Sequence, residues 1–116
     1  MQFVRGDSFS FKVLISSSRG NKIKIDDIAT IFVTCREHPN INYPILFQKT
    51  KNDVVLDDNS FLHIEFKPSD TENLDYGHYY FDIEITLNSG YRKTVLYNFE
   101  LTKETTIHLA GEINGN

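Results

Sequence analysis

Apolar and polar residues alternate one by one along most of this chain, and no other feature constrains its fold as strongly. In residues 8–16, SFSFKVLIS, every second side chain is apolar, and only Leu14 departs from the pattern. A period of two is typical of a β-strand that has one face on a core and the other in water. The pattern therefore predicts an extended segment here.

The same alternation returns in four later segments. Their apolar positions are Ile31, Val33 and Cys35; Ile41, Tyr43, Ile45 and Phe47; Leu62, Ile64 and Phe66; and Tyr79, Phe81, Ile83 and Ile85. Turn-forming residues separate the segments, at 16–22, 38–40, 51–53, 57–60 and 88–90. Such regular spacing, without a long helical stripe, predicts an all-β antiparallel sandwich of about seven to nine strands.

Size and charge limit the organisation and the partners. The chain has 116 residues, so we expect one β-sandwich domain over residues 1–110 and a flexible tail over 111–116. Lys and Arg total 12 against 16 Asp and Glu, for a net charge of −4. This balance argues against a nucleic-acid partner. No apolar run reaches the roughly 18 residues that span a membrane, and the N-terminus has no signal-peptide pattern. We expect synthesis in the cytoplasm and no membrane partner.

The strand register of the last long hairpin can be predicted from the sequence. If residues 88–90, Asn-Ser-Gly, form a three-residue loop with the glycine in the left-handed conformation, Leu87 pairs with Tyr91. Further along, Phe81 then pairs with Tyr97. A slip of one residue would move every inward side chain into water, so this register should be firm.

Two features precede the first strand of that hairpin. Ser69 and Glu72 match a capping box, which predicts one short helical turn near residues 69–74. Asp75, Gly77 and Tyr79 have the spacing of a tyrosine corner, in which the Tyr hydroxyl bonds to nearby backbone in immunoglobulin-like sandwiches. Tyr79 could instead cover one end of the core with its hydroxyl at the surface. The corner favours an immunoglobulin-like fold.

The tripeptide Arg5-Gly6-Asp7 has two interpretations. It is a known form of cell-adhesion ligand, which would have to be exposed and flanked by small polar residues. Here Val4 and Phe9 belong to flanking strands. Gly6 permits a positive φ, and the Asp7 side chain can accept from nearby backbone N–H groups, so the tripeptide favours a structural bend.

Three segments together resemble a known group of proteins. They are R-G-D-S-F-x-F at 5–11, G-N-x-I-x-I-x-D-I at 20–28, and L-x-x-G-x-Y-x-F-D-I-E-I at 74–85. The combination is similar to small phage- and prophage-encoded immunoglobulin-like β-sandwich proteins, especially the N-terminal domain of baseplate upper proteins and related tail or head–tail components. The resemblance implies a structural role for the early R-G-D bend. It also implies synthesis in a host cytoplasm followed by incorporation into a virion.

No motif of catalysis or metal binding stands out. The histidines, His38, His63, His78 and His108, are scattered, and no nucleophile elbow or phosphate loop occurs. Asp82 and Glu84 share one strand face and could form a carboxylate pair, but a solvated face is the simpler interpretation. Residues 57–59, Asp-Asp-Asn, read as a turn and not as a calcium loop. We expect no catalytic residues, no metal site and no cofactor.

The remaining candidates are a thiol and a few contact residues. Cys35 shares a face with other apolar residues, which predicts a buried side chain and not a reactive thiol. Tyr80, Tyr91 and Leu96 are expected at an interface, because exposed aromatic and aliphatic groups favour protein contacts. Alternatively, another part of the same chain covers them. The tail could do so, or could form an extra strand through Ile107 and Leu109.

These inferences favour a non-enzymatic component of a phage tail, baseplate or head–tail region, with itself or other phage structural proteins as partners. The alternative is an adhesin-like or carbohydrate-binding sandwich, for which glycan binding should be lost in Tyr80→Ala. A small hydrolase is a third class, and its activity should be lost in Asp82→Asn.

Overall fold

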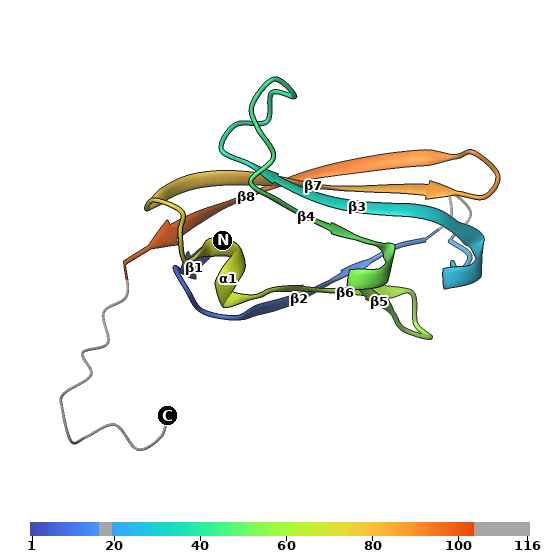
Figure 1. The fold of residues 1–116 in the computed structure, drawn as a ribbon. Coiled ribbons are helices and arrows are strands. Elements are labelled where there is room, and N and C mark those ends of the chain that lie inside the picture. The colour runs from blue at the N-terminus through green and yellow to red at the C-terminus, as the bar shows by residue number, and fades with distance from the viewer. Residues whose placement is uncertain (17–19, 104–116) are drawn as a thin grey trace, which may run out of the picture.

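The computed structural model describes residues 1–16 and 20–103, which form eight strands in two sheets and one short helix (Figure 1). The strands are β1 (Gln2–Val4), β2 (Phe9–Leu14), β3 (Ile28–Arg36), β4 (Phe47–Thr50), β5 (Val55–Leu56), β6 (Phe61–Phe66), β7 (Gly77–Leu87) and β8 (Arg92–Thr102). Helix α1 spans Pro68–Thr71, and two 3-10 turns, η1 (Ile25–Asp27) and η2 (Lys51–Asp53), precede β3 and follow β4. No helix in the described ranges is long and apolar enough to cross a membrane.

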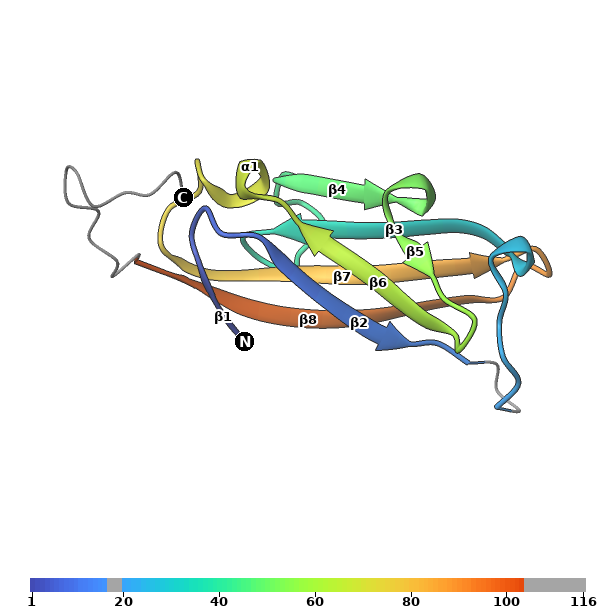
Figure 2. The ribbon, with the colours of Figure 1, turned by 90° about the horizontal axis from the view of Figure 1, so that it is seen from below.

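The larger sheet has the order β1-β8-β7-β3-β4, and the smaller has the order β2-β6-β5. They form the two layers seen in Figure 1, and Figure 2 shows β2 and β6 lying across the strands of the larger sheet. The all-β class and the number of strands are as predicted. The prediction of a purely antiparallel architecture is wrong at one edge, because β1 pairs in parallel with β8.

The β7–β8 hairpin has the register predicted from its loop. Phe81 lies opposite Tyr97, and the Leu87 N–H donates to the Tyr91 carbonyl at 2.8 Å. Gly90 has a φ of +93°, the left-handed conformation that the three-residue loop requires. The register prediction is therefore confirmed.

The core lies between the two sheets, where the predicted apolar rows face one another. In β6 the alternate residues Leu62, Ile64 and Phe66 are buried, and β2 packs its own apolar row against them. Phe66 is at the centre of an aromatic cluster, with ring centroids 5.3 Å from Phe11 and from Phe81. These contacts join one sheet to the other.

One predicted strand is mostly absent. Residues 41–45 form a loop, and only Phe47 of that alternating row belongs to a strand. Ile41 is 80% exposed, so its side chain covers no core. Local chemistry explains the difference: the Asn42 N–H donates to the Asn40 side chain at 2.9 Å, and Pro44 has no N–H to give to a sheet.

The helical turn lies slightly earlier than the predicted 69–74. The Lys67 N–H, at the N-cap, donates to the Asp70 carboxylate at 2.7 Å, and Pro68 occupies the first helical position. The prediction that Ser69 caps this turn is wrong. Asp70 also pairs with Lys49 of β4 at 2.5 Å, so the turn is anchored to the neighbouring sheet.

Candidate functional site

The Arg5-Gly6-Asp7 tripeptide forms the turn between β1 and β2. Gly6 has a φ of +83°, and the Asp7 N–H donates to the Val4 carbonyl at 3.1 Å. These are features of a type II β-turn, which favours glycine at its third position. Asp7 contributes its backbone N–H to this turn, and its side chain is exposed.

The arginine of this turn is occupied by contacts within the chain. The Arg5 guanidinium lies 4.1 Å from the centre of the Tyr76 ring and donates to the Tyr76 hydroxyl at 2.9 Å. It also donates to the Leu74 carbonyl at 3.1 Å, and the Gly6 N–H donates to the buried Thr71 hydroxyl at 3.1 Å. An adhesion ligand needs a free arginine, so these contacts favour the structural bend.

Tyr79 anchors the start of β7. Its side chain is buried, and its hydroxyl donates to the Asp75 carbonyl at 2.6 Å. Burial, followed by the nearby Asp75 charge, raises the pKa of Tyr79, which keeps the hydroxyl protonated as a donor. Gly77, between them, has a φ of +142°, which residues with a side chain rarely adopt.

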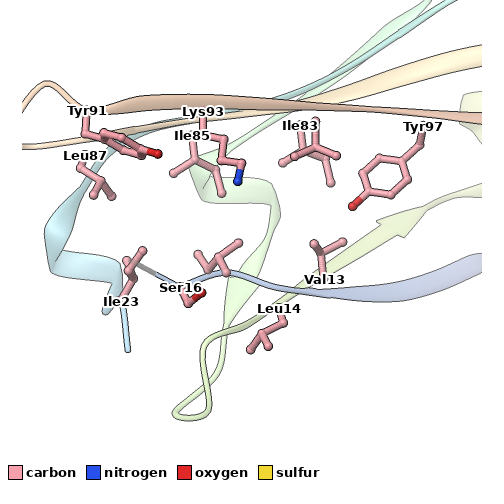
Figure 3. A pocket seen from close by; sticks show the side chains of 12 residues that line it. Val13, Leu14, Ser16, Ile23, Ile83, Ile85, Leu87, Tyr91, Lys93 and Tyr97 are labelled. Carbon is pink, nitrogen blue, oxygen red and sulfur yellow. The ribbon is translucent and has the colours of Figure 1, made fainter. Parts of the chain in front are cut away.

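The three predicted interface residues lie on two different faces. Tyr80 and Leu96 are on the outer face of the larger sheet, on neighbouring strands, with Tyr80 paired to Asn98. Tyr91, directly before β8, has the opposite parity and lies beside the space between the layers (Figure 3). They therefore do not form one patch.

The loop between β3 and β4 reaches the outer face near Tyr80. The Arg36 side chain donates to the Tyr43 carbonyl at 3.1 Å, and the His38 ring lies 6.4 Å from the Tyr80 ring. Tyr80 is only half-buried by these contacts. Part of the same chain thus covers this tyrosine, as the second interpretation of the sequence proposed.

Asp82 is the carboxylate with an unusual environment on that face. Burial raises the pKa of Asp82, the Arg36 charge lowers it, and Glu84 raises it further. Raised pKa values can mark catalytic acids. However, the hollow beside Asp82 and Leu96 holds only about 10 Å³, which is about the space of one water and too small for a substrate.

The other described acidic and histidine side chains either stabilise turns or lie too far from one another to form a site. Asp57 accepts from the Phe61 N–H at 3.0 Å and from His63 Nε2 at 2.8 Å, which makes residues 57–60 a bonded turn. No group of three His, Cys, Asp or Glu that could hold a metal occurs in residues 1–16 and 20–103. His108 lies outside the described residues.

Cys35 is fully buried in the core, as its place in the alternating row predicted. Burial, with a smaller effect of the Asp70 charge, raises the pKa of the thiol to about 12. A thiol with so high a pKa has almost no thiolate at neutral pH, and the thiolate is the reactive form. Cys35 therefore acts as a small apolar side chain.

An apolar cleft opens between the two sheets at the end of the molecule where β7 turns into β8 (Figure 3). Its volume is about 420 Å³. Val13 and Ile15 line one wall, and Ile83, Ile85 and Val95 line the other. Such a volume and lining are typical of sites that bind apolar groups. Sequence reasoning missed this cleft.

Side chains on the inner face of β8 and of the residue before it become more exposed toward the β7–β8 turn, because the two sheets lie further apart there. Phe99 is 1% exposed, Val95 is 37% exposed and Tyr91 is 55% exposed. All three have odd numbers, the parity that faces the opposite layer. Alternation indicates this parity but not the distance between the sheets, and the structure has an open cleft beside Val95 and Tyr91.

Lys93 is the one charged residue among the described residues that line this cleft. Its amine and the hydroxyl of Tyr97 point from the larger sheet toward the layer of β2 (Figure 3). Among its described lining residues, the cleft therefore offers apolar contact area, one amine and hydroxyl groups, and no carboxylate.

Comparisons with known proteins add little to this geometry. No protein-family model and no curated protein matches the chain. One solved structure that resembles it is a family 123 glycoside hydrolase from Clostridium perfringens, an enzyme of glycolipid glycan hydrolysis. The TM-score is 0.42 at 18% identity, and the match covers 89% of this chain but only 22% of the hydrolase. A likeness this weak, to a fifth of an enzyme, carries no conclusion about activity.

Proposed function

We propose that the two sheets form an immunoglobulin-like sandwich. In that fold, strands G, F and C share one sheet, with C′ added in variable domains, and B, E and D share the other. Taken in chain order, β2 to β8 occupy the places of B, C, C′, D, E, F and G. The bond from Tyr79 at the start of β7, the equivalent of strand F, supports this assignment.

The function that the geometry supports best is protein–protein interaction without catalysis. The observation that carries this proposal is the apolar cleft, in which Lys93 is the single charged residue among the described lining residues. Aliphatic and aromatic walls supply contact area to a partner, whereas a glycoside hydrolase uses a pair of carboxylates, and none is among these lining residues. The carboxylates Asp57 and Asp70 are instead bonded within the fold.

The biological setting of this interaction is a phage particle. The resemblance of segments 5–11, 20–28 and 74–85 to phage and prophage tail, baseplate and head–tail proteins supports this part of the proposal. In that setting the chain is made in the host cytoplasm and is then assembled into the virion. Its partners are copies of itself or neighbouring structural proteins.

Mass spectrometry of density-purified particles tests this proposal. An epitope-tagged chain, expressed from its own locus in an induced lysogen, should band with infectious particles at a fixed number of copies. A host cytoplasmic protein of similar abundance is the control for contamination. Absence of the chain from washed particles would refute the virion role.

A glycan array separates the carbohydrate-binding alternative from the virion role. If the chain binds a defined glycan and Tyr80→Ala abolishes that binding, the alternative replaces the present proposal. Thr94→Ala is a suitable control, because Thr94 lies on the same outer face in β8 and is paired with Glu84. Protein–protein interaction without catalysis predicts no saturable glycan binding by either form.

A further inference from the structure

One edge of the larger sheet is unpaired beside the apolar cleft. The Glu100 N–H donates to the Met1 carbonyl, and the Arg5 N–H donates to the Thr102 carbonyl, so even-numbered residues of β8 face the edge that β1 occupies. β1 pairs only with residues 100–102. By alternation, Thr94 and Leu96 direct their backbone groups to the same edge. On that edge, no strand within the described part of the chain pairs with Thr94 or Leu96.

The smaller sheet has an unpaired edge on the other side of the same opening. β2 is the outer strand of the order β2-β6-β5, and it pairs with β6 alone. Val13 and Ile15 of this layer and Val95 of β8 contribute apolar surface to the cleft between the two edges. An extended segment placed here would gain backbone hydrogen bonds from β8 and would bury its alternate side chains in the cleft. This arrangement is β-strand addition.

The C-terminal segment of this chain, residues 105–113, has the sequence that such a site requires. Ile107, Leu109 and Ile113 share one parity, whereas Thr106, His108 and Glu112 belong to the other. The segment would therefore have one apolar face and one polar face as a strand.

The charges of the segment and the edge are also complementary. Residues 105–113 contain one carboxylate side chain, Glu112, and no Lys or Arg, and Glu104 directly precedes them. The β8 edge begins with Arg92, and the cleft contains Lys93. Opposite charges favour this contact, although the whole chain has a net charge of −4.

We propose that residues 105–113 of a second copy of this chain add as a strand to the open edge of β8, with Ile107 and Leu109 in the cleft. This inference rests on the proposed interaction function and names its site and partner. A reciprocal exchange of tails would close as a two-fold dimer.

The reach of the chain favours a second copy over the same molecule. β1 already occupies the β8 edge at residues 100–102, so a tail that turned back at Lys103 would have to pass around β1. Leu96 lies six residues, or about 20 Å of strand, from Thr102, and the five steps from Thr102 to Ile107 span at most about 18 Å. Ile107 therefore cannot lie beside Leu96 of its own molecule, and the seven steps to Leu109, at most about 25 Å, leave little length for the path around β1. A second copy has no such limit.

Sedimentation equilibrium of the full chain tests whether residues 105–113 mediate self-association. The wild type should self-associate in a concentration-dependent way, and the double variant Ile107→Asp/Leu109→Asp should weaken the association at least about tenfold, because the carboxylates would be buried in an apolar cleft. The control is Thr106→Asp/His108→Asp, which adds the same charge to the polar face of the segment. This control should associate nearly as tightly as the wild type.

A second pair of variants tests the cleft. Val95→Lys places a charge in the cleft, and Leu96→Lys places the same charge on the opposite face of the same strand. Val95→Lys should weaken association at least about tenfold, while Leu96→Lys should change it little. Thermal unfolding of each variant shows whether it is folded. A synthetic peptide of residues 104–116, in excess, should dissociate the wild-type assembly.

Several outcomes would overturn this inference. A wild type that is monomeric at all concentrations would overturn it. This includes the case in which residues 105–113 bind the cleft of their own molecule. Equal weakening by Val95→Lys and Leu96→Lys would place the contact elsewhere. Each of these results would leave the virion role intact, since that role is tested by the composition of purified particles. Conversely, absence from particles would leave self-association unaffected.

Discussion

The substitution Phe66→Ala should show how much the aromatic core contributes to the free energy of unfolding, compared with a partly exposed Phe. Phe66 is fully buried at the end of β6, and its ring lies 5.0 Å from Phe47 and 6.0 Å from Phe99 of the opposite sheet. No other ring in the described residues is within aromatic contact of so many others. We therefore expect Phe66→Ala to be the most damaging substitution in this layer.

The expected cost is about 3–5 kcal/mol, the range for a buried Phe replaced by Ala. It combines lost transfer free energy, the cavity that remains, and lost edge-to-face contacts worth about 0.5–1.5 kcal/mol each. A domain of this size has a total stability of about 5–15 kcal/mol. The variant should therefore be close to the limit of folding.

Phe61→Ala is the matched control in the same strand. Phe61 is only half-buried and has the opposite parity to Phe66, and the Lys12 amine lies 4.5 Å from its ring centre. Its loss should cost about 1 kcal/mol or less.

Urea unfolding followed by far-UV circular dichroism and tyrosine fluorescence measures both variants, since the chain has no Trp. With a slope near 2 kcal/mol/M, Phe66→Ala should lower the midpoint by about 2 M. Equal losses for Phe66→Ala and Phe61→Ala would refute the reasoning, because the two faces of β6 would then not differ in burial.

Three further predictions concern single sites. Gly6→Ala should cost about 1–2 kcal/mol in urea unfolding, because no atom lies within 4 Å of an added Cβ and the cost is the positive φ alone; an unchanged midpoint would contradict the turn. Cys35 should react with a thiol reagent only after unfolding, because its pKa is about 12, and rapid labelling of the native chain would contradict its burial. The pKa of Asp82 is raised in the folded state, so stability falls as pH rises from about 4 through that pKa. Asp82→Asn should therefore raise the urea midpoint at pH 7, and the gain should shrink toward pH 4; a gain independent of pH would contradict this cause.

Local patterns predicted the elements whose structure depends on nearby residues. The β7–β8 hairpin follows from the Gly90 loop and from alternation on both sides of it, since all its pairs are set once the loop is set. The turn at Gly6 has the same origin. In both cases the residues that decide the structure are within a few positions of the turn.

The same alternation failed where no partner strand was available. Residues 41–45 alternate as well as any other segment, yet they form an exposed loop. Alternation describes the two faces of a strand, but it does not supply hydrogen bonds from a neighbour. Pro44 and the side-chain bond of Asn40 decided the outcome against the sheet.

The candidate site was predicted only in part. Tyr91 was expected to be a contact residue, and it does line the cleft, but Tyr80 and Leu96 lie on the opposite face. The cleft itself has no local signal in the sequence. It lies beside the part of β8 that β1 does not reach, since β1 pairs with β8 over only three residues.

By itself, the sequence determined which segments are extended, which side of each is apolar, and how the chain turns at Gly6 and Gly90, because these properties depend on residues close together in the chain. The tertiary structure alone decided that β1 runs parallel to β8, that residues 41–45 leave the sheet, and that the layers separate beside Val95. Those outcomes depend on the packing and pairing of segments far apart in the chain, and a period of two carries no information about which distant segment becomes the neighbour.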